Sequence, residues 1–194
     1  MGRHKEFDRN KVLEKAAAMF RKQGYEATSV QDLVTCMGIN RGSLYDTFGD
    51  KQALFLSALD YYRETYANNL ISALQQSTEG VSSIRQFFNA LVNSRSGEEG
   101  CQGCLMVNTV VERMLHDKET ADKVSAHLTV LEDAFYQALL RAQRLGELNR
   151  SPEDLRRLAR YFVSCANGLC VSAKASPDPS VLQDIADTTL SVLE

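Results

Sequence analysis

The chain has 194 residues, of which 44% are hydrophobic and 24% are charged, and its formal net charge at neutral pH is −3. This composition provides a hydrophobic core and excludes wholesale disorder, and no apolar run reaches the ~18 residues that a membrane-spanning helix requires. The N-terminal stretch MGRHKEFDRNK lacks the apolar middle of a signal peptide, and five cysteines with mixed spacing do not resemble a secreted disulfide framework. We therefore expect a cytoplasmic protein with reduced thiols and no membrane partner.

The charge is distributed unevenly along the chain. Residues 1–51 contain 9 Lys/Arg and 7 Asp/Glu, whereas residues 52–194 contain 13 and 18. This asymmetry fits a small basic module carried on an acidic body, although a difference of this size also arises by chance. The net charge alone argues against nucleic-acid binding, so the sequence motifs must show whether the protein binds DNA.

The first predicted helix begins after Asp8, a residue type that favours N-caps, and ends at Gly24. Phe7 and Val12 are spaced as a hydrophobic staple around this cap. Apolar residues recur at helical spacing between the two ends, which indicates an amphipathic helix.

A second helix is predicted to open at Ser29, where Ser29 and Asp32 form a variant of the capping box, and to end at Gly38. Asn40 is placed to cap a third helix that runs from about Arg41 to Phe48. The glycine between the two helices predicts a tight turn.

The rest of the chain also has helical periodicity, and no alternating strand pattern competes with it. The sequence therefore predicts an all-α protein of nine helices. The last six are expected as a long helix capped by Asp50 and reaching Leu70, one carrying residues 84–92, one from Cys104 to about Leu115, one from Lys118 to Leu145, one opening at Ser151-Pro152 and one from Val181 to Leu193. Residues 93–103 are predicted to form a polar loop.

A helix, a glycine turn and a second helix across Ser29 to Phe48 form the helix-turn-helix arrangement, whose second helix enters the DNA major groove N-terminus first. Small residues at 42 and 43 allow the backbone to approach DNA closely, and Arg41 can contact a guanine edge with two hydrogen bonds. Leu44 and Phe48 are spaced to anchor the helix on its own domain. The alternative is a plain helical hairpin, which is common.

Residues 24–55, GYEATSVQDLVTCMGINRGSLYDTFGDKQALF, resemble the N-terminal domain of the TetR family of bacterial transcriptional repressors. The resemblance covers Phe-x-x-x-Gly-Tyr, Thr-Ser-Val-x-Asp-Leu, Gly-Ile-x-x-Gly-Ser-Leu-Tyr-x-x-Phe and Lys-x-x-Leu. It implies a three-helix DNA-binding domain (1–51) and a helical domain for effector binding and dimerisation (52–194). It further implies a homodimeric repressor that binds palindromic operator DNA and is released by a small-molecule effector of unknown identity.

Matched position by position, the resemblance implies which residues of this chain contact DNA. At the second and third helices and the start of the fourth, these residues are Ser29, Val30, Gln31, Arg41, Gly42, Ser43, Tyr45, Thr47 and Lys51. Tyr45 and Lys51 are expected to contact phosphates rather than bases. Asp46 departs from the family, which often has an aromatic residue or His there, and a carboxylate is repelled by phosphates.

The stretch GCLMVNTVVE (residues 103–112) resembles a subgroup of these regulators that carries Gly-Cys-Leu and includes sensors of oxidants or electrophiles. Cys104, in the first turn of a helix, is therefore a candidate sensor, with Cys101 as its partner thiol. The alternative is that Cys104 is a buried apolar filler, as we expect for Cys36, Cys165 and Cys170. Cys101-x-x-Cys104 also leaves open a metal-responsive regulator on the same fold.

The helix that opens at Ser151 carries small residues among larger apolar ones, which favours close helix packing. The family resemblance implies a dimer interface formed by the last two helices, and the alternative is an internal core helix. The expected interface residues are Phe162, Ala166, Gly168, Leu169, Ser172 and Ile185.

An enzyme has little support in the sequence. The chain has three His residues and no glycine-rich phosphate loop or nucleophile elbow. Glu112 and His116, four residues apart, are a possible metal pair but are more typical of a solvated helix face. We therefore expect neither catalysis nor a cofactor.

Overall fold

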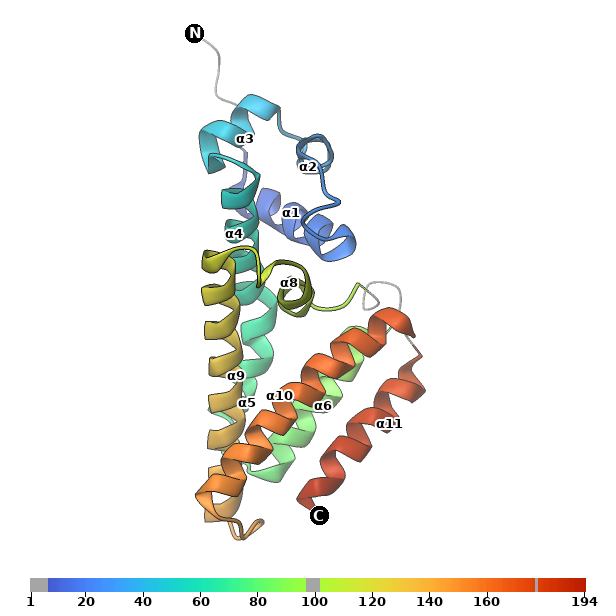
Figure 1. The fold of residues 1–194 in the computed structure, drawn as a ribbon. Helices are drawn as coiled ribbons and strands as arrows, with labels where there is room; N and C mark the ends of the chain where they lie inside the picture. The colour runs from blue at the N-terminus through green and yellow to red at the C-terminus, as the bar shows by residue number, and fades with distance from the viewer. Residues whose placement is uncertain (1–6, 97–101, 177) are drawn as a thin grey trace.

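The computed structural model describes residues 7–96, 102–176 and 178–194, and every regular element in these residues is a helix (Figure 1). The expected all-α fold is confirmed. In chain order the elements are α1 (Arg9–Gln23), α2 (Val30–Met37), α3 (Arg41–Phe48), α4 (Lys51–Tyr62), a π-helical turn (Arg63–Ala67), α5 (Asn68–Gln76), α6 (Val81–Arg95), α8 (Leu105–Arg113), α9 (Lys118–Arg144), α10 (Pro152–Ala175), α11 (Pro179–Leu190) and a final 3-10 turn (Ser191–Leu193).

Helices α1, α2 and α3 gather at one end of the molecule, and α4 runs from this head into the body (Figure 1). The side chains at the centre of the head are at most 1% exposed: Phe20, Leu33, Leu44, Leu54 and Phe55. Helix α4 packs against α1 and thereby belongs to the head as well as to the body. The domain boundary expected at residue 51 stays a prediction.

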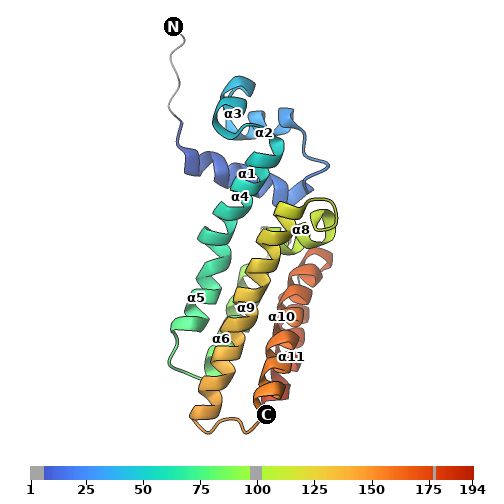
Figure 2. The same cartoon turned by 60° about the vertical axis from the view of Figure 1, so that its left-hand side comes forward.

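The body is a bundle in which α9 and α10 pack along each other, with α5, α6 and α11 beside them (Figure 2). Its centre is an aromatic cluster whose contacting rings have centroids between 4.8 and 5.9 Å apart. The cluster consists of Phe87, Phe88, Phe135 and Phe162. Each such ring pair contributes ~0.5–1.5 kcal/mol beyond the burial of its area, so the cluster fixes how these helices pack.

The prediction of one long fourth helix was wrong in one respect: a π-helical turn divides this stretch into α4 and α5. A π turn adds residues to one turn and rotates the following face. Tyr62 and Ile71 are buried, whereas Tyr61 is half-buried and Thr65 is exposed. No Gly or Pro lies within the turn to indicate it in the sequence.

Smaller differences lie at helix ends. Cys104 is the N-cap of α8 rather than a residue of its first turn, and α8 ends at Arg113 rather than Leu115. Helix α11 begins at Pro179, two residues before the expected start, because Asp178 caps it and proline is favoured at the first helical position. Among the described residues, no helix combines the length and the apolar character that crossing a lipid bilayer would need.

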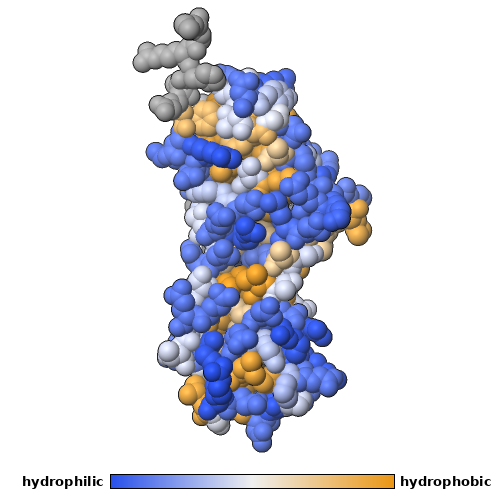
Figure 3. Space-filling view, turned by 90° about the vertical axis from the view of Figure 1, so that its left-hand side faces the viewer, coloured by the Kyte–Doolittle hydropathy of each residue, from blue (hydrophilic) through white to orange (hydrophobic). Residues whose placement is uncertain are grey.

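The face formed by α4, α5 and α9 carries its apolar atoms as separate islands among hydrophilic ones (Figure 3). Scattered apolar residues of this kind are normal for a protein surface and do not indicate a binding site by themselves.

Candidate nucleic-acid interface and ligand cavity

The connection between α2 and α3 is a fixed turn. Gly38 has a φ of 73°, in the left-handed region, and its N–H donates to the Val34 carbonyl over 3.0 Å. The Asn40 side chain caps α3 by accepting a hydrogen bond from the Ser43 N–H at 2.7 Å. Leu44 and Phe48 are buried against the head, as predicted from their spacing. The orientation of α3 is therefore set by a turn, a cap and two anchors.

The opposite side of α3 faces solvent. Its exposed residues are Arg41, Gly42, Tyr45, Asp46 and Thr47, and Ser43 is half-buried. Arg41 makes no ion pair with any other described residue, so its guanidinium is available to an external acceptor. A Cβ at position 42 would lie 3.2 Å from the Asn40 Oδ1, so the glycine also leaves room for the cap. Asp46 thus contributes a carboxylate to the exposed residues of this helix.

The start of α2 has the predicted capping box. The Ser29 hydroxyl accepts from the Asp32 N–H at 3.1 Å and donates to the Asp32 carboxylate at 2.6 Å, while the Ser29 N–H donates to the same carboxylate. These hydrogen bonds lower the pKa of Asp32. The Ser29 side chain is therefore committed to the cap, whereas Gln31 is exposed and Val30 is half-buried.

Lys51, the first residue of α4, lies over an aromatic ring. Its Nζ is 4.1 Å from the centroid of the Tyr25 ring, and the side chain is half-buried. A cation–π contact of this kind stabilises by ~0.5–1 kcal/mol at an exposed site. The phosphate contact expected for Lys51 stays a prediction. To make it, the Lys51 ammonium would have to reach a phosphate from its place over the Tyr25 ring.

The body contains a small cavity of about 50 Å³. A single water requires roughly 10–15 Å³ by this measure, so the cavity holds a ligand of only a few non-hydrogen atoms without rearrangement. Its lining is mostly apolar and comes from five helices and the π turn. The residues are Ala67, Leu70, Ile71, Phe87, Leu91, Arg95, Cys104, Met106, Val107, His127, Leu128, Leu131, Ala166, Asn167 and Cys170.

Two buried nitrogen atoms in this lining have no hydrogen-bond partner among the described residues, the Arg95 Nε and the His127 Nδ1. His127 is only 7% exposed, and burial lowers its pKa, so its ring is neutral at pH 7. Arg95 also donates from Nη1 to the Gly103 carbonyl at 3.0 Å. Because buried polar atoms are nearly always satisfied, these two nitrogens favour a polar atom of a ligand or a water in the cavity.

Cys104 and Cys170 are both buried in the cavity wall. The burial of Cys170 agrees with the expectation that it is an apolar filler, and its thiol also influences the titration of Cys104. The neighbouring Cys170 lowers the pKa of Cys104 against the effect of burial, with Arg95 acting in the same direction, and Cys104 raises the pKa of Cys170. Cys101, the partner thiol expected for Cys104, lies outside the described residues.

Nothing in the local sequence indicates that both thiols line one cavity, since positions 104 and 170 are 66 apart in the sequence. Cys36 and Cys165 are half-buried and do not line the cavity. In the described part of the chain, no group of three or more His, Cys, Asp or Glu side chains is arranged to hold a metal ion.

The comparisons with known proteins agree with this geometry. The family profile described as "Bacterial regulatory proteins, tetR family" matches residues 12–58, and that of a "Tetracyclin repressor-like, C-terminal domain" matches residues 80–189. The chain belongs to the TetR family. It is a DNA-binding transcriptional regulator of the helix-turn-helix type.

Relatives of known sequence cover nearly the whole chain. The HTH-type transcriptional regulator YezE of Bacillus subtilis (strain 168) is 42% identical over 194 residues, which is 100% of both chains. The HTH-type transcriptional repressor ComR of Escherichia coli (strain K12) is 31% identical over 191 residues, covering 97% of this chain and 90% of that one.

Among solved structures, a cysteine mutant of the TetR family transcriptional regulator CifR, complexed with 26-base-pair double-strand operator DNA, superposes with a TM-score of 0.87. It is 26% identical, and the match covers 98% of each chain. The fold of this chain is therefore that of a TetR-type regulator from end to end.

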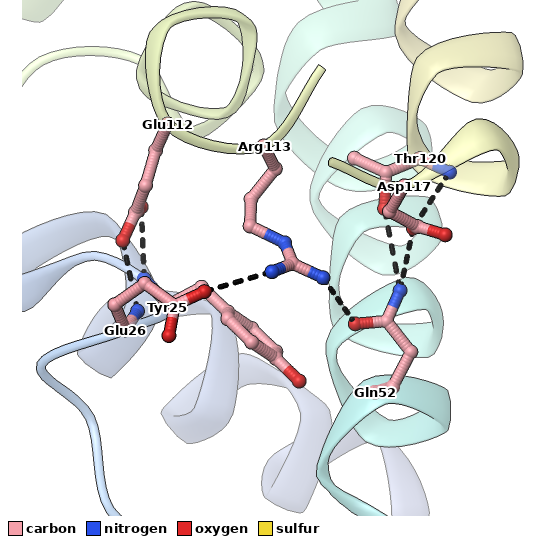
Figure 4. A network of polar contacts seen from close by, with 7 residues as sticks. All are labelled: Tyr25, Glu26, Gln52, Glu112, Arg113, Asp117 and Thr120. Atoms are coloured by element: carbon pink, nitrogen blue, oxygen red, sulfur yellow. Dashed lines mark hydrogen bonds and ion pairs between the residues drawn. The ribbon is translucent and has the colours of Figure 1, made fainter. Parts of the chain in front are cut away.

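In this TetR-type fold, the head is joined to the body by a polar latch at the end of α8, formed by Glu112 and Arg113 (Figure 4). The Glu112 carboxylate accepts from the backbone N–H groups of Tyr25, at 2.9 Å, and Glu26, at 2.8 Å. Both donors lie just past the end of α1. Glu112 was expected on a solvated face or in a metal pair with His116, and both interpretations were wrong, because its carboxylate binds backbone donors of the head.

Arg113 completes the latch from the same end of α8. Its Nη1 forms an ion pair with Glu26 at 2.8 Å, its Nη2 donates to Gln52 of α4 at 3.0 Å, and its guanidinium carbon lies 4.1 Å from the Tyr25 ring centroid. Gln52 in turn donates to Asp117, the N-cap of α9, at 2.6 Å. Hydrogen bonding from Thr120 keeps the pKa of Asp117 below its usual range, so this acceptor is charged.

The residues expected at a dimer interface divide into two groups. Phe162, Ala166 and Leu169 are at most 4% exposed and pack in the core of their own chain, so an internal role explains them. Gly168 is exposed, and Ser172 and Ile185 are half-buried. Only these last three remain available as predicted contacts with a second subunit.

Proposed function

We propose that this TetR-type regulator is a repressor that binds a palindromic operator as a homodimer and is released when a signal reaches the cavity. The observation that carries the DNA-binding part is the surface of α3. Arg41, with no ion-pair partner among the described residues, stands at the N-terminus of a helix whose orientation is fixed by Gly38, Asn40 and two buried anchors. A long donor on a rigid, exposed helix end is what base-edge reading in the major groove requires.

The relatives support the same proposal. CifR was solved with operator DNA, and ComR is described as a repressor. Residues on α3 and at the start of α4 would then have three roles. Arg41 reads a base, Gly42 and Ser43 permit close approach, and Tyr45 and Lys51 contact phosphates.

A homodimer is supported by an exposed stripe on α10. Residues 161, 164, 168, 171 and 175 are all exposed and recur at helical spacing. Tyr161 and Val171 are 40% and 51% exposed, and Val181 at the start of α11 is 42% exposed. Apolar side chains with this much exposure beside a glycine suit helix packing against a second subunit. A dimer would place two heads about one DNA turn, ~34–36 Å, apart, and so read a palindrome.

The cavity supports release by an effector. A small, mostly apolar molecule that carries one hydrogen-bonding group would match the apolar lining and the unpaired nitrogens of Arg95 and His127. A reactive molecule is the second form of signal, since the Cys104 thiol lines the same space. Met106 and Val107 of α8 also line the cavity, and the other end of α8 carries the latch, so an occupant would act on the head through this helix.

The test is selection of binding sites by the purified protein from a pool of random duplexes, followed by titration of the selected duplex. We expect a palindromic site bound by two subunits, with affinity that falls steeply as salt rises. Selection of no preferred sequence, or of a site without two-fold symmetry, would contradict the proposal.

A further inference from the structure

The wall of the cavity holds a positive charge. Among the described residues that line it, Arg95, the last residue of α6, is the only Lys, Arg, Asp or Glu. Its Nη1 donates to the Gly103 carbonyl at 3.0 Å, and its enclosed Nε has no hydrogen-bond partner among the described residues. No described Asp or Glu forms an ion pair with this guanidinium. Because buried charges in proteins are normally paired, Arg95 favours an external anion in the cavity.

The groups that act on the charge of Arg95 are Tyr62, Cys104 and Cys170. Burial raises the pKa of Tyr62 to about 12, so its hydroxyl is neutral at pH 7. Cys104 and burial raise the pKa of Cys170, so this thiol is neutral as well. Only the Cys104 thiol, whose pKa is lowered, is able to offset the cation by ionising. An anion that enters the cavity would compete with this thiolate, since two neighbouring anions repel each other.

The chemistry of the wall selects among anions. A guanidinium presents Nε–H and one Nη2–H side by side, and this edge matches the two oxygens of a carboxylate. The hydrogen bond to Gly103 uses Nη1 and therefore leaves the Nε edge for an external acceptor. Most of the remaining wall is apolar and includes Leu91, Val107 and Leu131. These side chains suit an alkyl chain, whereas the further oxygens of a phosphate would lie against them without donors.

The size of the cavity limits the length of the alkyl chain. Its volume of about 50 Å³ is the space of roughly three to five water molecules. We propose that the cavity binds a short-chain aliphatic monocarboxylate of about the size of propionate, with the carboxylate on the Nε edge of Arg95 and the alkyl chain among the apolar side chains. This names the chemical class of the effector. A role of the acid in releasing DNA rests on the proposed function, whereas its binding does not.

The experiment titrates the full-length protein by isothermal calorimetry, at constant ionic strength and in a buffer without carboxylates. The probes are sodium propionate, propionamide, sodium octanoate and inorganic phosphate. Propionamide is the matched control, because it has nearly the same shape as propionate but no charge. We expect saturable binding of propionate, with propionamide bound about tenfold or more weakly, because a hydrogen bond to a charged group is lost. Octanoate should bind more weakly than propionate because it exceeds the cavity, and phosphate should not bind.

Each opposite result would overturn the proposal. Equal affinity for propionamide would mean that the charge is not recognised, and equal affinity for phosphate would mean a general anion site. Tighter binding of octanoate would mean that the cavity does not set the length of the ligand. No saturable binding of propionate at millimolar concentration would remove the site altogether. These four results come from wild type and so do not depend on whether a variant folds.

Two substitutions locate the site. Arg95→Gln should weaken propionate about tenfold or more and leave propionamide unchanged, so that the preference for the acid is lost. Arg85→Gln, at an exposed position on the same helix, should leave both affinities unchanged. Retention of the preference in a folded Arg95→Gln protein would contradict the assignment. Operator binding is measured separately without any acid, so a failure of the proposed function appears there and leaves the calorimetric result intact.

Discussion

At the level of single residues, Arg41 is the side chain on which base recognition depends. Arg41→Ala should weaken operator binding by ~1–3 kcal/mol, because a bidentate contact with guanine has that value. It should also relax the preference at one base pair in each half-site. Binding to the selected operator and to its single-base variants, measured by fluorescence anisotropy, checks both effects.

Lys51→Ala is the matched comparison, since Lys51 is expected to contact a phosphate. It should weaken binding to every sequence equally and reduce the salt slope by about one unit for each lysine lost. If Arg41→Ala behaved in the same uniform manner, Arg41 would be a phosphate contact and its base-reading role would be wrong.

Cys104 provides a second prediction at this scale, from the direction of its pKa. An ordinary thiol has a pKa near ~8.5, so its thiolate fraction and alkylation rate fall about tenfold for each pH unit below that value. Because its pKa is lowered, the alkylation rate of Cys104 should fall less between pH 8 and pH 6.5 than that of an ordinary thiol. Rates per cysteine, measured by mass spectrometry against a free peptide that contains the same residues, test this. A decline parallel to that of the peptide would contradict it.

The role of a residue was predictable where the pattern that indicates it lies within a single helix. The exposure of Arg41 and the burial of Leu44 and Phe48 follow from spacing within one helix. Cys104 and Cys170 line one cavity from two helices that are distant in the sequence, and no periodicity within either helix indicates this. For the same reason Phe162, Ala166 and Leu169 were assigned to the wrong surface, because a helix pattern shows which side is apolar but not what covers it.

At the level of elements, α8 is the helix that joins the cavity to the head. Glu112→Gln should loosen this connection, because the carboxylate accepts two backbone hydrogen bonds and an amide offers one oxygen. Loss of a hydrogen bond to a charged group costs ~1.5–3 kcal/mol, and 1.4 kcal/mol is a factor of ten. Hydrogen exchange at the Tyr25 and Glu26 amides should therefore accelerate about tenfold or more.

Glu119→Gln is the control for this measurement, since Glu119 is an exposed residue in the first turn of α9. It should leave exchange at both amides unchanged. Unaltered hydrogen exchange in Glu112→Gln would mean that the latch does not couple α8 to the head.

Helix boundaries were predictable where neighbouring residues alone determine them. Asp8, Ser29 and Asn40 cap their helices as expected, because capping is decided within four residues. The π turn and the latch were not predictable. No Gly or Pro marks the first, and the second brings Glu112 to backbone groups 86 and 87 positions earlier in the chain.

At the level of the whole molecule, the proposed dimer gives a prediction at Gly168. A Cβ at this position meets no atom within 4 Å, and glycine is unfavourable within a helix, so Gly168→Glu should not disturb the folded subunit. In a dimer through α10, the substitution would bury two like charges. A penalty of ~3 kcal/mol for buried unpaired charge corresponds to roughly 100-fold weaker association.

Sedimentation of Gly168→Glu should accordingly show monomers at concentrations where wild type is dimeric, with specific DNA binding lost in parallel. Ser125→Glu, at an exposed position on α9, should remain dimeric. A dimeric Gly168→Glu protein that binds DNA normally would place the interface elsewhere.

The central claim is that the exposed surface of α2 and α3 binds operator DNA, and one titration tests it most directly. A labelled duplex from the region upstream of the protein's own gene is titrated with wild type at several salt concentrations, in the presence of excess unrelated DNA. We expect saturable binding of two subunits, a preference over unrelated DNA and a linear fall of log affinity with log salt concentration. Equal affinity for unrelated DNA, or affinity independent of salt, would contradict it.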